Sequence, residues 1–515
     1  MNIVVQNLTR FGDLLQSQPA LAELAGQGHA LSVACLENFA GAAALLPEAT
    51  TIFPLPGARF LAGLAADWRQ ALTTVTEFAD AVAAKAAPEA VVNLTAALSS
   101  RLLARRLCGD AVRGFSLDAF GFRHESTPWA AFLEASSARR GLSPFNVVDL
   151  FRKSAGVGQG RGRFALRRPD PADAATARGL LNGLGHGPLV VGFQLGASAA
   201  ARQWPVEYFA QTANRLWQDV GAVAVLVGTG SEKPLAAQFV ALCQGPCLDL
   251  VGATNLPLLA AVTAELRLLV TNDTGTLHLA AGLGIPSVAI FLATAQPFDT
   301  GPYLAGCLCL EPDMPCHPCP FGRPCPHDHA CLTAIAPQAV AAAAVTYCRT
   351  GQFVPGSYPG ARAWLSGFDD TGFMDLFSLS GHDREARAIW LRCQRHVLRQ
   401  FLDDVPFTPP ESSATPGLGD AERHNLLRLL AQSADMLRLI EGQAVLAART
   451  SAMKSRFLSS YERLSALWAA SPHLAVLGQL WRRQAQEQVA DLDRLVANIR
   501  RFAACIQAFT DLIEA

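Results

Sequence analysis

The sequence predicts an α/β protein with two parallel-sheet domains in tandem and an α-helical domain after them. Short runs rich in valine, isoleucine and leucine alternate with helical stretches over residues 1–168, which is typical of a parallel sheet with crossover helices. The same alternation starts again over residues 169–350. Strand signals vanish after a linker rich in proline, serine and glycine that ends at residue 420.

The length and composition of the chain limit the number of its domains and the classes of partner that it can bind. Its 515 residues suit two or three domains, and half of them are hydrophobic, which is ample material for buried cores. With 42 Lys and Arg against 43 Asp and Glu, the chain lacks the basic excess of nucleic-acid binders, so no nucleic-acid partner is expected.

The N-terminus and the apolar runs predict a protein of the cytoplasm. The segment MNIVVQNLTRFGD has no basic region of the kind that opens a signal peptide. The longest apolar stretch, residues 279–295, is interrupted by Gly284 and Pro286 and is too short for a membrane-spanning helix.

The first domain, residues 1–168, opens with a predicted strand at NIVVQNL. TRFGD follows as a turn, and LLQSQPALAEL has the apolar spacing of a helix. HALSVACL and AVVNLTA are predicted as further strands, and the Gly- and Arg-rich residues 154–163 as a loop that leaves the domain.

The second domain, residues 169–350, repeats this order. PLVVGFQLG is a predicted strand that enters a glycine turn, and Pro205 suits the first turn of the helix that follows. LRLLVTND is a later strand that leads into the helix TGTLHLAAGLG. Tandem domains of this kind bind ligands in the cleft between them, outside the carboxyl ends of the strands.

Residues 351–420 are predicted as a crossover and linker, and residues 421–515 as a helical hairpin or bundle. Apolar residues recur there at three- and four-residue spacing on two stretches that Ser471-Pro472 separates. The first stretch contains Leu426, Leu430, Leu437, Ile440 and Ala444, and the second contains Val489, Leu492, Val496, Ile499, Ala503 and Ile506. A packing appendage and a partner- or acceptor-binding module are both open interpretations.

The stretch LLVTNDTGTLHLAAGLG predicts an anion-binding site. A buried strand runs into Asp273, Thr274, Gly275 and Thr276, where a helix begins. First-turn N–H groups of a helix lack intrahelical partners and lie at the positive end of the dipole. Gly275 lets a diphosphate approach the backbone closely, and His278 lies one turn on from Thr274 on the same face. Asp273 either caps the helix or contacts a ligand.

Three other polar side chains follow predicted strands. Arg202, in GASAAARQWP, precedes a helix and can neutralise a phosphate. Glu232 comes after the next strand, where a carboxylate could hold ribose hydroxyls. Asp13 follows Gly12 at a strand-to-helix turn, where it either caps the helix or faces the interdomain cleft as a general base.

Cys316, Cys319, Cys325 and Cys331 have the spacing C-x2-C-x5-C-x5-C within the Cys-rich loop 307–331. Clustered cysteines in a cytoplasmic chain indicate a metal or redox site rather than structural disulfides. Four thiolates could hold Zn or Fe at about 2.3 Å from sulfur. His317, His327 and His329 are spare ligands, although a solvated loop residue is the preferred interpretation of each. A reduced loop with no metal is the alternative interpretation.

Together these motifs resemble the family 9 glycosyltransferases, the bacterial ADP-heptose heptosyltransferases. The resemblance covers roughly residues 1–350, and the motifs occur in the family's order. They are RFGDLLQSQPAL (10–21), VVNLTAALSSRLLARRL (91–107), GASAAARQWPVEYF (196–209), NDTGTLHLAAGLGIPSVAIF (272–291) and GPY (301–303). The resemblance implies a GT-B architecture, in which two Rossmann-like domains face a cleft and the second holds most of the nucleotide-sugar.

The resemblance also implies roles for the residues that match the family's motifs. Asp13 matches the general base that takes the proton of the acceptor hydroxyl. The backbone of Thr274, Gly275 and Thr276 would hold the diphosphate. The same donor motif also contains Asp273 and His278.

Other matches are less direct. Ser198 matches a hydroxyl position in the phosphate turn, and Glu232 matches an acid that contacts the nucleoside. Arg202 stands where the family usually has lysine, and its planar fork is a different donor from a compact ammonium. The usual basic residue close after the first strand is represented only by Arg10, and the compact lipopolysaccharide enzymes lack the long helical C-terminus.

The function that the resemblance implies is inverting transfer of heptose, or a similar sugar, from an ADP-sugar to a hydroxyl of lipopolysaccharide core or another surface glycan. No catalytic cofactor is implied. One alternative is a protein heptosyltransferase that modifies surface proteins, since such relatives carry a Cys cluster that holds iron. Another is a non-catalytic scaffold with the same fold. Peripheral contact with the inner membrane and oligomers through the C-terminal helices complete the expected partners.

Overall fold

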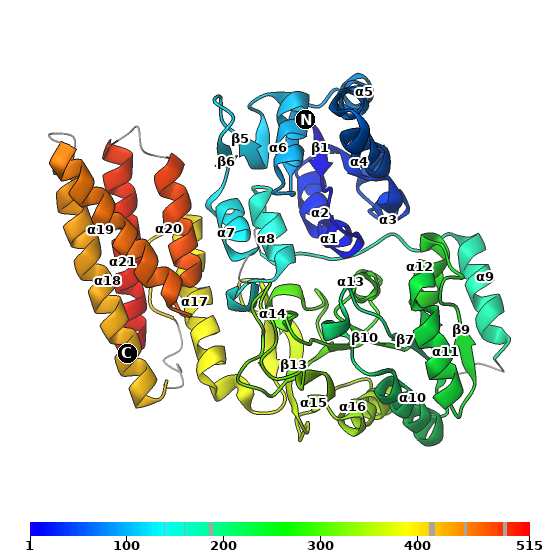
Figure 1. The fold of residues 1–515 in the computed structure, drawn as a ribbon. Helices are drawn as coiled ribbons and strands as arrows, with labels where there is room; N and C mark the ends of the chain where they lie inside the picture. Colours follow the sequence, from blue (N-terminus) through cyan, green and yellow to red (C-terminus); the bar gives the residue numbers. More distant parts are fainter. Residues whose placement is uncertain are drawn as a thin grey trace. The chain divides into compact units, whose positions relative to one another are not determined.

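The computed structural model describes residues 1–137, 140–158, 160–184, 189–410, 418–447, 451–487 and 492–514. The chain forms two compact units, and Figure 1 shows their elements. The first unit, residues 1–127 and 146–380, contains two sheets, and the second, residues 128–145 and 381–515, is helical. The predicted α/β class with an additional helical region is confirmed.

The first sheet has the strand order β3-β2-β1-β4-β5-β6. Its strands are β1 (Asn2–Gln6), β2 (Ala30–Leu36), β3 (Ala49–Leu55), β4 (Ala90–Asn93), β5 (Val112–Leu117) and β6 (Arg123–Glu125). All neighbours are parallel except β5 and β6. The β-branched run Ile3–Val5 is buried in the central strand, as expected for a parallel strand covered on both faces. The carboxyl ends of β1 to β5 therefore share one edge.

Helices follow the strands of this sheet as the sequence predicts. They are α1 (Phe11–Gln16), α2 (Gln18–Gly26), α3 (Ala40–Ala43), α4 (Gly57–Ala66), α5 (Trp68–Ala86), α6 (Leu98–Cys108) and α8 (Val147–Ser154), with a short 3-10 turn η1 at Glu37–Phe39. Phe53, Phe78, Val82 and Leu103 belong to the apolar core between this sheet and its helices.

The second sheet has the order β14-β13-β12-β11-β10-β7-β8-β9. Its strands are β7 (Val190–Gln194), β8 (Val223–Val227), β9 (Cys247–Asp249), β10 (Leu268–Asn272), β11 (Ser287–Ile290), β12 (Leu308–Pro312), β13 (Ala361–Phe368) and β14 (Met374–Ser378). The strands from β12 to β9 run parallel, and β13 and β14 are added antiparallel. Buried Trp204, Phe193 and Phe209 pack edge to face in its core.

The helices of the second sheet are α9 (Pro171–Asn182), α10 (Val206–Val220), α11 (Lys233–Leu242), α12 (Leu256–Ala264), α13 (Gly275–Gly282), α14 (Pro297–Thr300), α15 (Cys331–Ala334) and α16 (Pro337–Thr350). Helix α10 begins directly after Pro205, which occupies the N-cap position rather than the first turn. The 3-10 turns η3 (Ala200–Arg202) and η4 (Gly230–Glu232) follow β7 and β8.

The range 351–420 is more than the predicted crossover and linker. It contains β13, β14 and α17 (Ala386–Asp403). Apolar and polar residues do not alternate regularly in ARAWLSGF, the sequence of β13. Its buried residues include the polar Arg362 and Ser366. Arg362 is accommodated by an ion pair with Asp313 and by the Met314 carbonyl, contacts that only the folded sheet provides.

The helical unit contains α7 (Pro128–Ser137) as well as the C-terminal helices. The others are α17, α18 (Asp420–Ala447), α19 (Ser451–Ala470), α20 (Ala475–Glu487) and α21 (Leu492–Glu514). The predicted first domain, residues 1–168, is therefore interrupted by residues 128–145, which belong to the helical unit. Trp129 of α7 donates its indole N–H to Asp403 (2.7 Å), and Arg483 pairs with Glu134 (2.6 Å). No helix in the described ranges has the length and apolarity that crossing a membrane requires.

The predicted apolar faces of the helical unit are confirmed in part. All five residues of the first stretch are buried, and so are Ile499 and Ile506 of the second. Leu492 is exposed, Val496 and Ala503 are half-buried, and Val489 lies outside the described residues. The buried face of α21 instead includes Phe502, Cys505 and Phe509, because aromatic rings bury more apolar area than alanine does.

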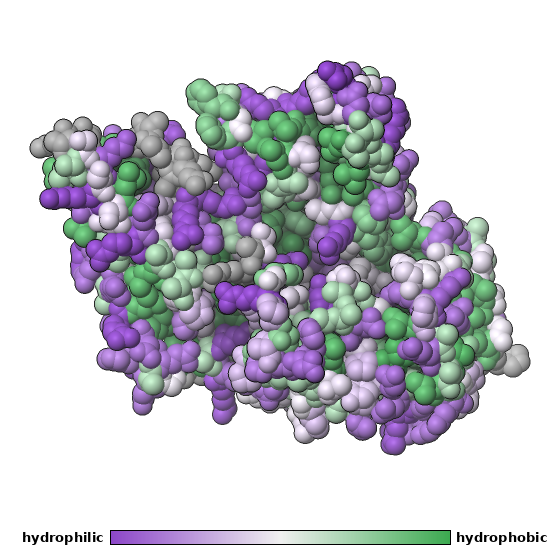
Figure 2. Space-filling view, viewed as in Figure 1, coloured by the Kyte–Doolittle hydropathy of each residue, from purple (hydrophilic) through white to green (hydrophobic). Residues whose placement is uncertain are grey.

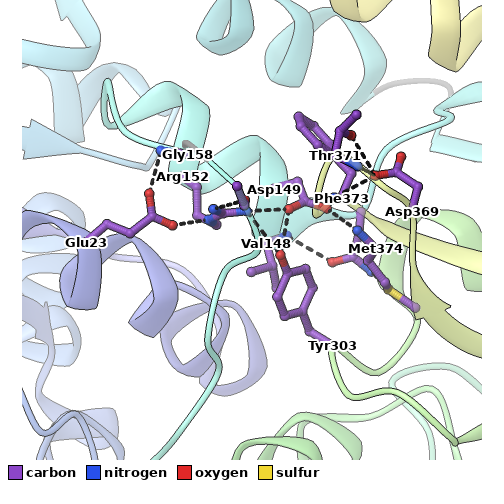
Figure 3. A network of polar contacts seen from close by, with 12 residues as sticks. Glu23, Val148, Asp149, Arg152, Gly158, Tyr303, Asp369, Thr371, Phe373 and Met374 are labelled. Carbon is purple, nitrogen blue, oxygen red and sulfur yellow. Dashed lines mark hydrogen bonds and ion pairs between the residues drawn. The ribbon is translucent and has the colours of Figure 1, made fainter.

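A buried polar network ties helix α2 of the first sheet to the second sheet domain (Figure 3). Arg152 of α8 pairs with Glu23 and with Asp149 (2.9 Å), and it donates to the Gly160 carbonyl (2.7 Å). The Tyr303 hydroxyl donates to Asp149 (2.7 Å). Burial and the Asp149 carboxylate raise the pKa of Tyr303 above its usual range, so the phenol keeps the proton that it donates.

We expect Asp149→Asn to destabilise the first unit. The substitution removes one charge of a buried pair and leaves Glu23 as the one carboxylate paired with Arg152 among the described residues, a loss that typically costs about 3–5 kcal/mol. The matched control is Asp80→Asn, whose carboxylate forms an exposed pair with Arg106 (2.7 Å) and should contribute about 0–1 kcal/mol. Denaturant unfolding followed by tryptophan fluorescence measures both, and equal midpoints for the two variants would contradict the role of the network.

Candidate functional site

The first turn of α13 is open at its N-terminus. Strand β10 ends at Asn272, and Thr274 precedes α13 in an extended conformation (φ −140°, ψ 169°). The Thr274 side chain makes no capping hydrogen bond. The first-turn N–H groups, including those of Gly275 and Thr276, therefore keep the capacity to bind an anion.

The first turn of α1 lies directly against this terminus. A Cβ atom on Gly12 would lie 2.8 Å from Cδ2 of His278 and 3.2 Å from Cα of Gly275. A Cβ atom on Gly275 would lie 2.3 Å from Cδ1 of Phe11. Both glycines are thus required by a close approach between the two sheet domains. The structure in this way brings together two motifs that are far apart in the sequence, with Asp13 next to Gly12.

Asp13 is half-buried, and its side chain has no competing partner. Its backbone carbonyl accepts a hydrogen bond from the Asn7 amide (3.0 Å). Among the residues that the structure describes, none donates to the Asp13 carboxylate or forms an ion pair with it. The capping alternative is therefore not observed, and the carboxylate oxygens are available to a ligand.

Arg202, Asp273 and Ser198 form one polar cluster beside the same terminus. The Arg202 guanidinium pairs with the Asp273 carboxylate through Nη2 and donates from Nη1 to the Ser198 hydroxyl (3.0 Å). Its Nε atom is buried and has no hydrogen-bond partner in the described part of the chain. An unused buried N–H donor next to open backbone N–H groups is suited to an anionic oxygen.

Glu232 belongs to a hydrogen-bond chain that ends at Thr276. Its carboxylate accepts from the Thr229 N–H (2.6 Å) and from the Gln194 amide (2.8 Å). Gln194 in turn accepts from the Thr276 hydroxyl (3.0 Å). A Cβ atom on Gly196 would lie 1.5 Å from a carboxylate oxygen of Glu232, so this carboxylate covers the glycine turn. The Thr276 hydroxyl is therefore already hydrogen-bonded within the protein, and its backbone N–H is the group that can bind a ligand.

Asn272 and Gln194 are positioning residues that the sequence analysis missed. Asn272 is fully buried, accepts from the Trp204 N–H (3.0 Å), and donates to the carbonyls of Leu195 (2.8 Å) and Gly196 (3.1 Å). These bonds hold the loop after β7 against the end of β10. An amide side chain at the end of a buried strand is the signal that could have indicated Asn272.

Cys316, Cys319 and Cys325 lie between β12 and α15, and Cys331 is the first residue of α15. Burial raises the pKa of the Cys319 and Cys331 thiols, and the nearby thiols of Cys316 and Cys325 raise it further. Among the described residues, however, no three of these sulfurs lie within 4.8 Å of one another. Tetrahedral Zn or Fe with ligands at about 2.3 Å needs a closer set. The structural metal therefore stays a prediction.

His317 is buried rather than solvated, and one of its ring nitrogens is already engaged. Its Nε2 atom lies 3.1 Å from Oε2 of Glu311, and both side chains are buried. The other oxygen of Glu311 accepts from the Trp364 indole N–H (3.1 Å). This histidine fixes the start of the Cys-rich loop to β12 instead.

Comparison with known proteins identifies relatives over the middle of the chain. Residues 84–330 match the model of glycosyltransferase family 9 (heptosyltransferase). Lipopolysaccharide heptosyltransferase 1 of Pseudomonas aeruginosa is 31% identical over 162 residues, which cover 31% of this chain and 41% of that protein. Lipopolysaccharide heptosyltransferase 2 of Escherichia coli is 32% identical over 114 residues, 21% of this chain and 32% of the relative. The chain thus spans less than half the length of either.

Solved structures extend the likeness of the fold. A family 9 glycosyl transferase from Veillonella parvula superposes with a TM-score of 0.51 at 21% identity, over 60% of this chain and 84% of that one. The E. coli ADP-heptose lps heptosyltransferase II gives a TM-score of 0.51 at 19% identity, over 68% and 99%. The GT-B architecture is therefore confirmed. The predicted resemblance is confirmed over this part of the chain: residues 84–330 match the model of glycosyltransferase family 9 (heptosyltransferase), and additional helices follow them toward the C-terminus.

Proposed function

We propose that the protein transfers heptose, or a similar sugar, from an ADP-sugar to an acceptor hydroxyl with inversion at the anomeric carbon. The observation that supports this most is the contact of Gly12 with His278 and Gly275. This contact brings Asp13, whose carboxylate has no partner among the described residues, close to the open N-terminus of α13. A transfer of this kind needs a general base and a group that binds the leaving phosphate.

The donor diphosphate would bind at the first turn of α13. The N–H groups of Gly275 and Thr276 and the guanidinium of Arg202 can neutralise its charge. These groups stabilise the departing ADP most strongly when its negative charge has fully developed, so they lower the barrier as well as bind the donor. Glu232, at the far end of the hydrogen-bond chain, would contact the nucleoside.

The acceptor hydroxyl would be activated by Asp13. As its oxygen attacks C1 of the sugar, the bond from C1 to the phosphate oxygen breaks on the opposite face, and the hydroxyl proton passes to the Asp13 carboxylate. One displacement of this kind inverts the configuration at C1. Because the carboxylate has no partner among the described residues, its lone pairs are not already occupied.

The acceptor is a hydroxyl of lipopolysaccharide core, of another surface glycan, or of a protein. The relatives named above are lipopolysaccharide heptosyltransferases, which supports the first of these. A scaffold without catalytic activity would have no need for an unpaired half-buried carboxylate at the contact between the sheet domains.

Asp13→Asn is expected to bind ADP like the wild type and to lose transfer activity by about 10²–10⁴-fold, because the amide cannot take the proton. Single-turnover assays with radiolabelled ADP-heptose measure transfer, and calorimetry measures ADP affinity. Asp80→Asn, at an exposed carboxylate of α5, is the control and should leave both unchanged. Unchanged turnover of Asp13→Asn would remove this residue from the mechanism.

Arg202→Gln should weaken ADP binding by about tenfold or more, since a charged hydrogen bond contributes about 1.5–3 kcal/mol. Arg202→Lys keeps the charge and should recover part of the affinity. Calorimetric titration with ADP is the measurement. The control is Arg215→Gln, which removes an exposed pair with Asp219 (2.6 Å) on α10 and should not change affinity. Wild-type affinity in Arg202→Gln would place the diphosphate elsewhere.

A further inference from the structure

The turn CQGPC, residues 243–247, carries a thiol at each end. Cys243 directly follows α11, and Cys247 is the first residue of β9, the strand at one edge of the second sheet. Both cysteines are free and half-buried, whereas Gln244 and Pro246 between them are exposed. The turn therefore lies at the protein surface, within reach of a reagent in solution.

Side chains of α10 hold this turn in place. The Gln244 N–H donates to the Asn214 side chain (2.7 Å), and Gln218 donates to the side chain of Gln244 (3.1 Å). A Cβ atom on Gly245 would lie 2.6 Å from Cγ of Trp217, so the ring packs against the turn at a distance that only glycine allows. Figure 2 shows mostly hydrophilic residues over α10 on this face. The two thiols thus stand at the ends of a fixed turn in hydrophilic surroundings.

The two thiols are in contact with each other across the turn. The Cys247 thiol donates a hydrogen bond to the Cys243 sulfur. Sγ of Cys243 also lies 3.5 Å from the carbonyl oxygen of Gly245, inside the same turn. To form a disulfide, the sulfurs need to approach only from hydrogen-bonding distance to the bond length of about 2.05 Å. A disulfide can therefore close within the turn.

The same contact gives the two thiols different acidities. The hydrogen bond from Cys247 lowers the pKa of Cys243 to about 7, although burial opposes it. The hydrogen bond to Cys243, burial and the nearby carboxylate of Asp249 raise the pKa of Cys247 above its usual range. By contrast, burial alone raises the pKa of Cys35 to about 11, as expected for an inert thiol. Near neutral pH, Cys243 is thus the nucleophile of the pair and Cys247 keeps its proton.

The pair suits a redox reaction better than a metal ion. Structural zinc sites take four side-chain ligands, and catalytic zinc sites take three. Among the side chains that the structure describes, no third His, Cys, Asp or Glu joins the two sulfurs in a group whose ligand atoms all lie within 4.8 Å of one another. A thiolate beside a second thiol is instead the arrangement that thiol–disulfide exchange requires.

We propose that Cys243 and Cys247 form a thiol–disulfide exchange site for small hydrophilic disulfides. The Cys243 thiolate attacks one sulfur of the small disulfide, forms a mixed disulfide and releases a thiolate, which takes up a proton. Cys247 then loses its proton and attacks the Cys243 sulfur, which releases the second small thiol. The two cysteines are oxidised to one disulfide, and the small disulfide is reduced to two thiols. This reaction does not depend on the proposed sugar transfer.

The test treats the reduced full chain with oxidised glutathione near neutral pH, blocks the remaining thiols with iodoacetamide and digests the protein with trypsin. Because trypsin does not cleave before Pro234, residues 216–267 form one peptide, which contains Cys243, Cys247 and no other cysteine. Mass spectrometry should find this peptide unalkylated and lighter by two hydrogens than its dithiol form. Recovery of the peptide with both cysteines alkylated would overturn the proposal.

Two serine variants separate the roles of the cysteines. Cys247→Ser should retain glutathione on Cys243 as a mixed disulfide, because the second thiol is missing, and Cys243→Ser should give no adduct on Cys247. Cys108→Ser is the control: Cys108 is half-buried at the end of α6, burial raises its pKa, and its loss should leave the disulfide of the turn unchanged. A mixed disulfide that persists in the wild type as it does in Cys247→Ser would contradict the exchange.

The rate of alkylation checks which thiol is the nucleophile. Iodoacetamide near neutral pH should modify Cys243 about tenfold faster than Cys108, because the larger thiolate fraction of Cys243 outweighs its lower intrinsic nucleophilicity. Cys247→Ala removes the hydrogen-bond donor and should slow the alkylation of Cys243 and raise the midpoint of its pH profile, whereas Cys108 should react as before. Equal rates for Cys243 and Cys108 in the wild type would overturn the assignment of Cys243 as the nucleophile.

Discussion

The burial of the Arg152 guanidinium is the constraint on which the first unit depends. A charge that water cannot reach must find all of its partners in the protein, and Arg152 finds them in Glu23, Asp149 and the Gly160 carbonyl. Tyr303 joins through Asp149, so one network connects helix α2, helix α8 and the second sheet domain. A Cβ atom on Gly162 would lie 2.7 Å from Nε of Arg152, which leaves no room for another residue there.

The close contact of α1 with α13 follows from domains held in this way. Helix α2 is fixed by Glu23, and α1 directly precedes it in the chain. Gly12 and Gly275 then allow two helix ends to approach at backbone distance, where any side chain would collide. The candidate site is the product of this approach, because only the contact between α1 and α13 brings Asp13 next to the open first turn of α13.

Two regions of the first unit differ in chemistry. The loop after β7 and the first turn of α13 carry a network of charges and hydrogen bonds, in which one buried guanidinium N–H has no partner among the described residues. A pocket between α4, α5 and α6 of the first sheet domain has a largely apolar wall instead. The first arrangement suits an anion, and the second suits apolar groups. The helical unit has its own aromatic core around Trp468, Trp481 and Phe502.

Local patterns in the sequence determined the parallel strands, most helices and the residues of the donor motif. Such features depend on periodicity and on the identity of neighbouring residues, which are read along the chain. Only the tertiary structure decided that Arg202 pairs with Asp273, that α7 joins the helical unit, that β13 extends the sheet with a buried Arg362, and that Gly12 meets His278. These contacts join residues far apart in sequence, and their energy depends on burial and on partners that exist only after the chain has folded.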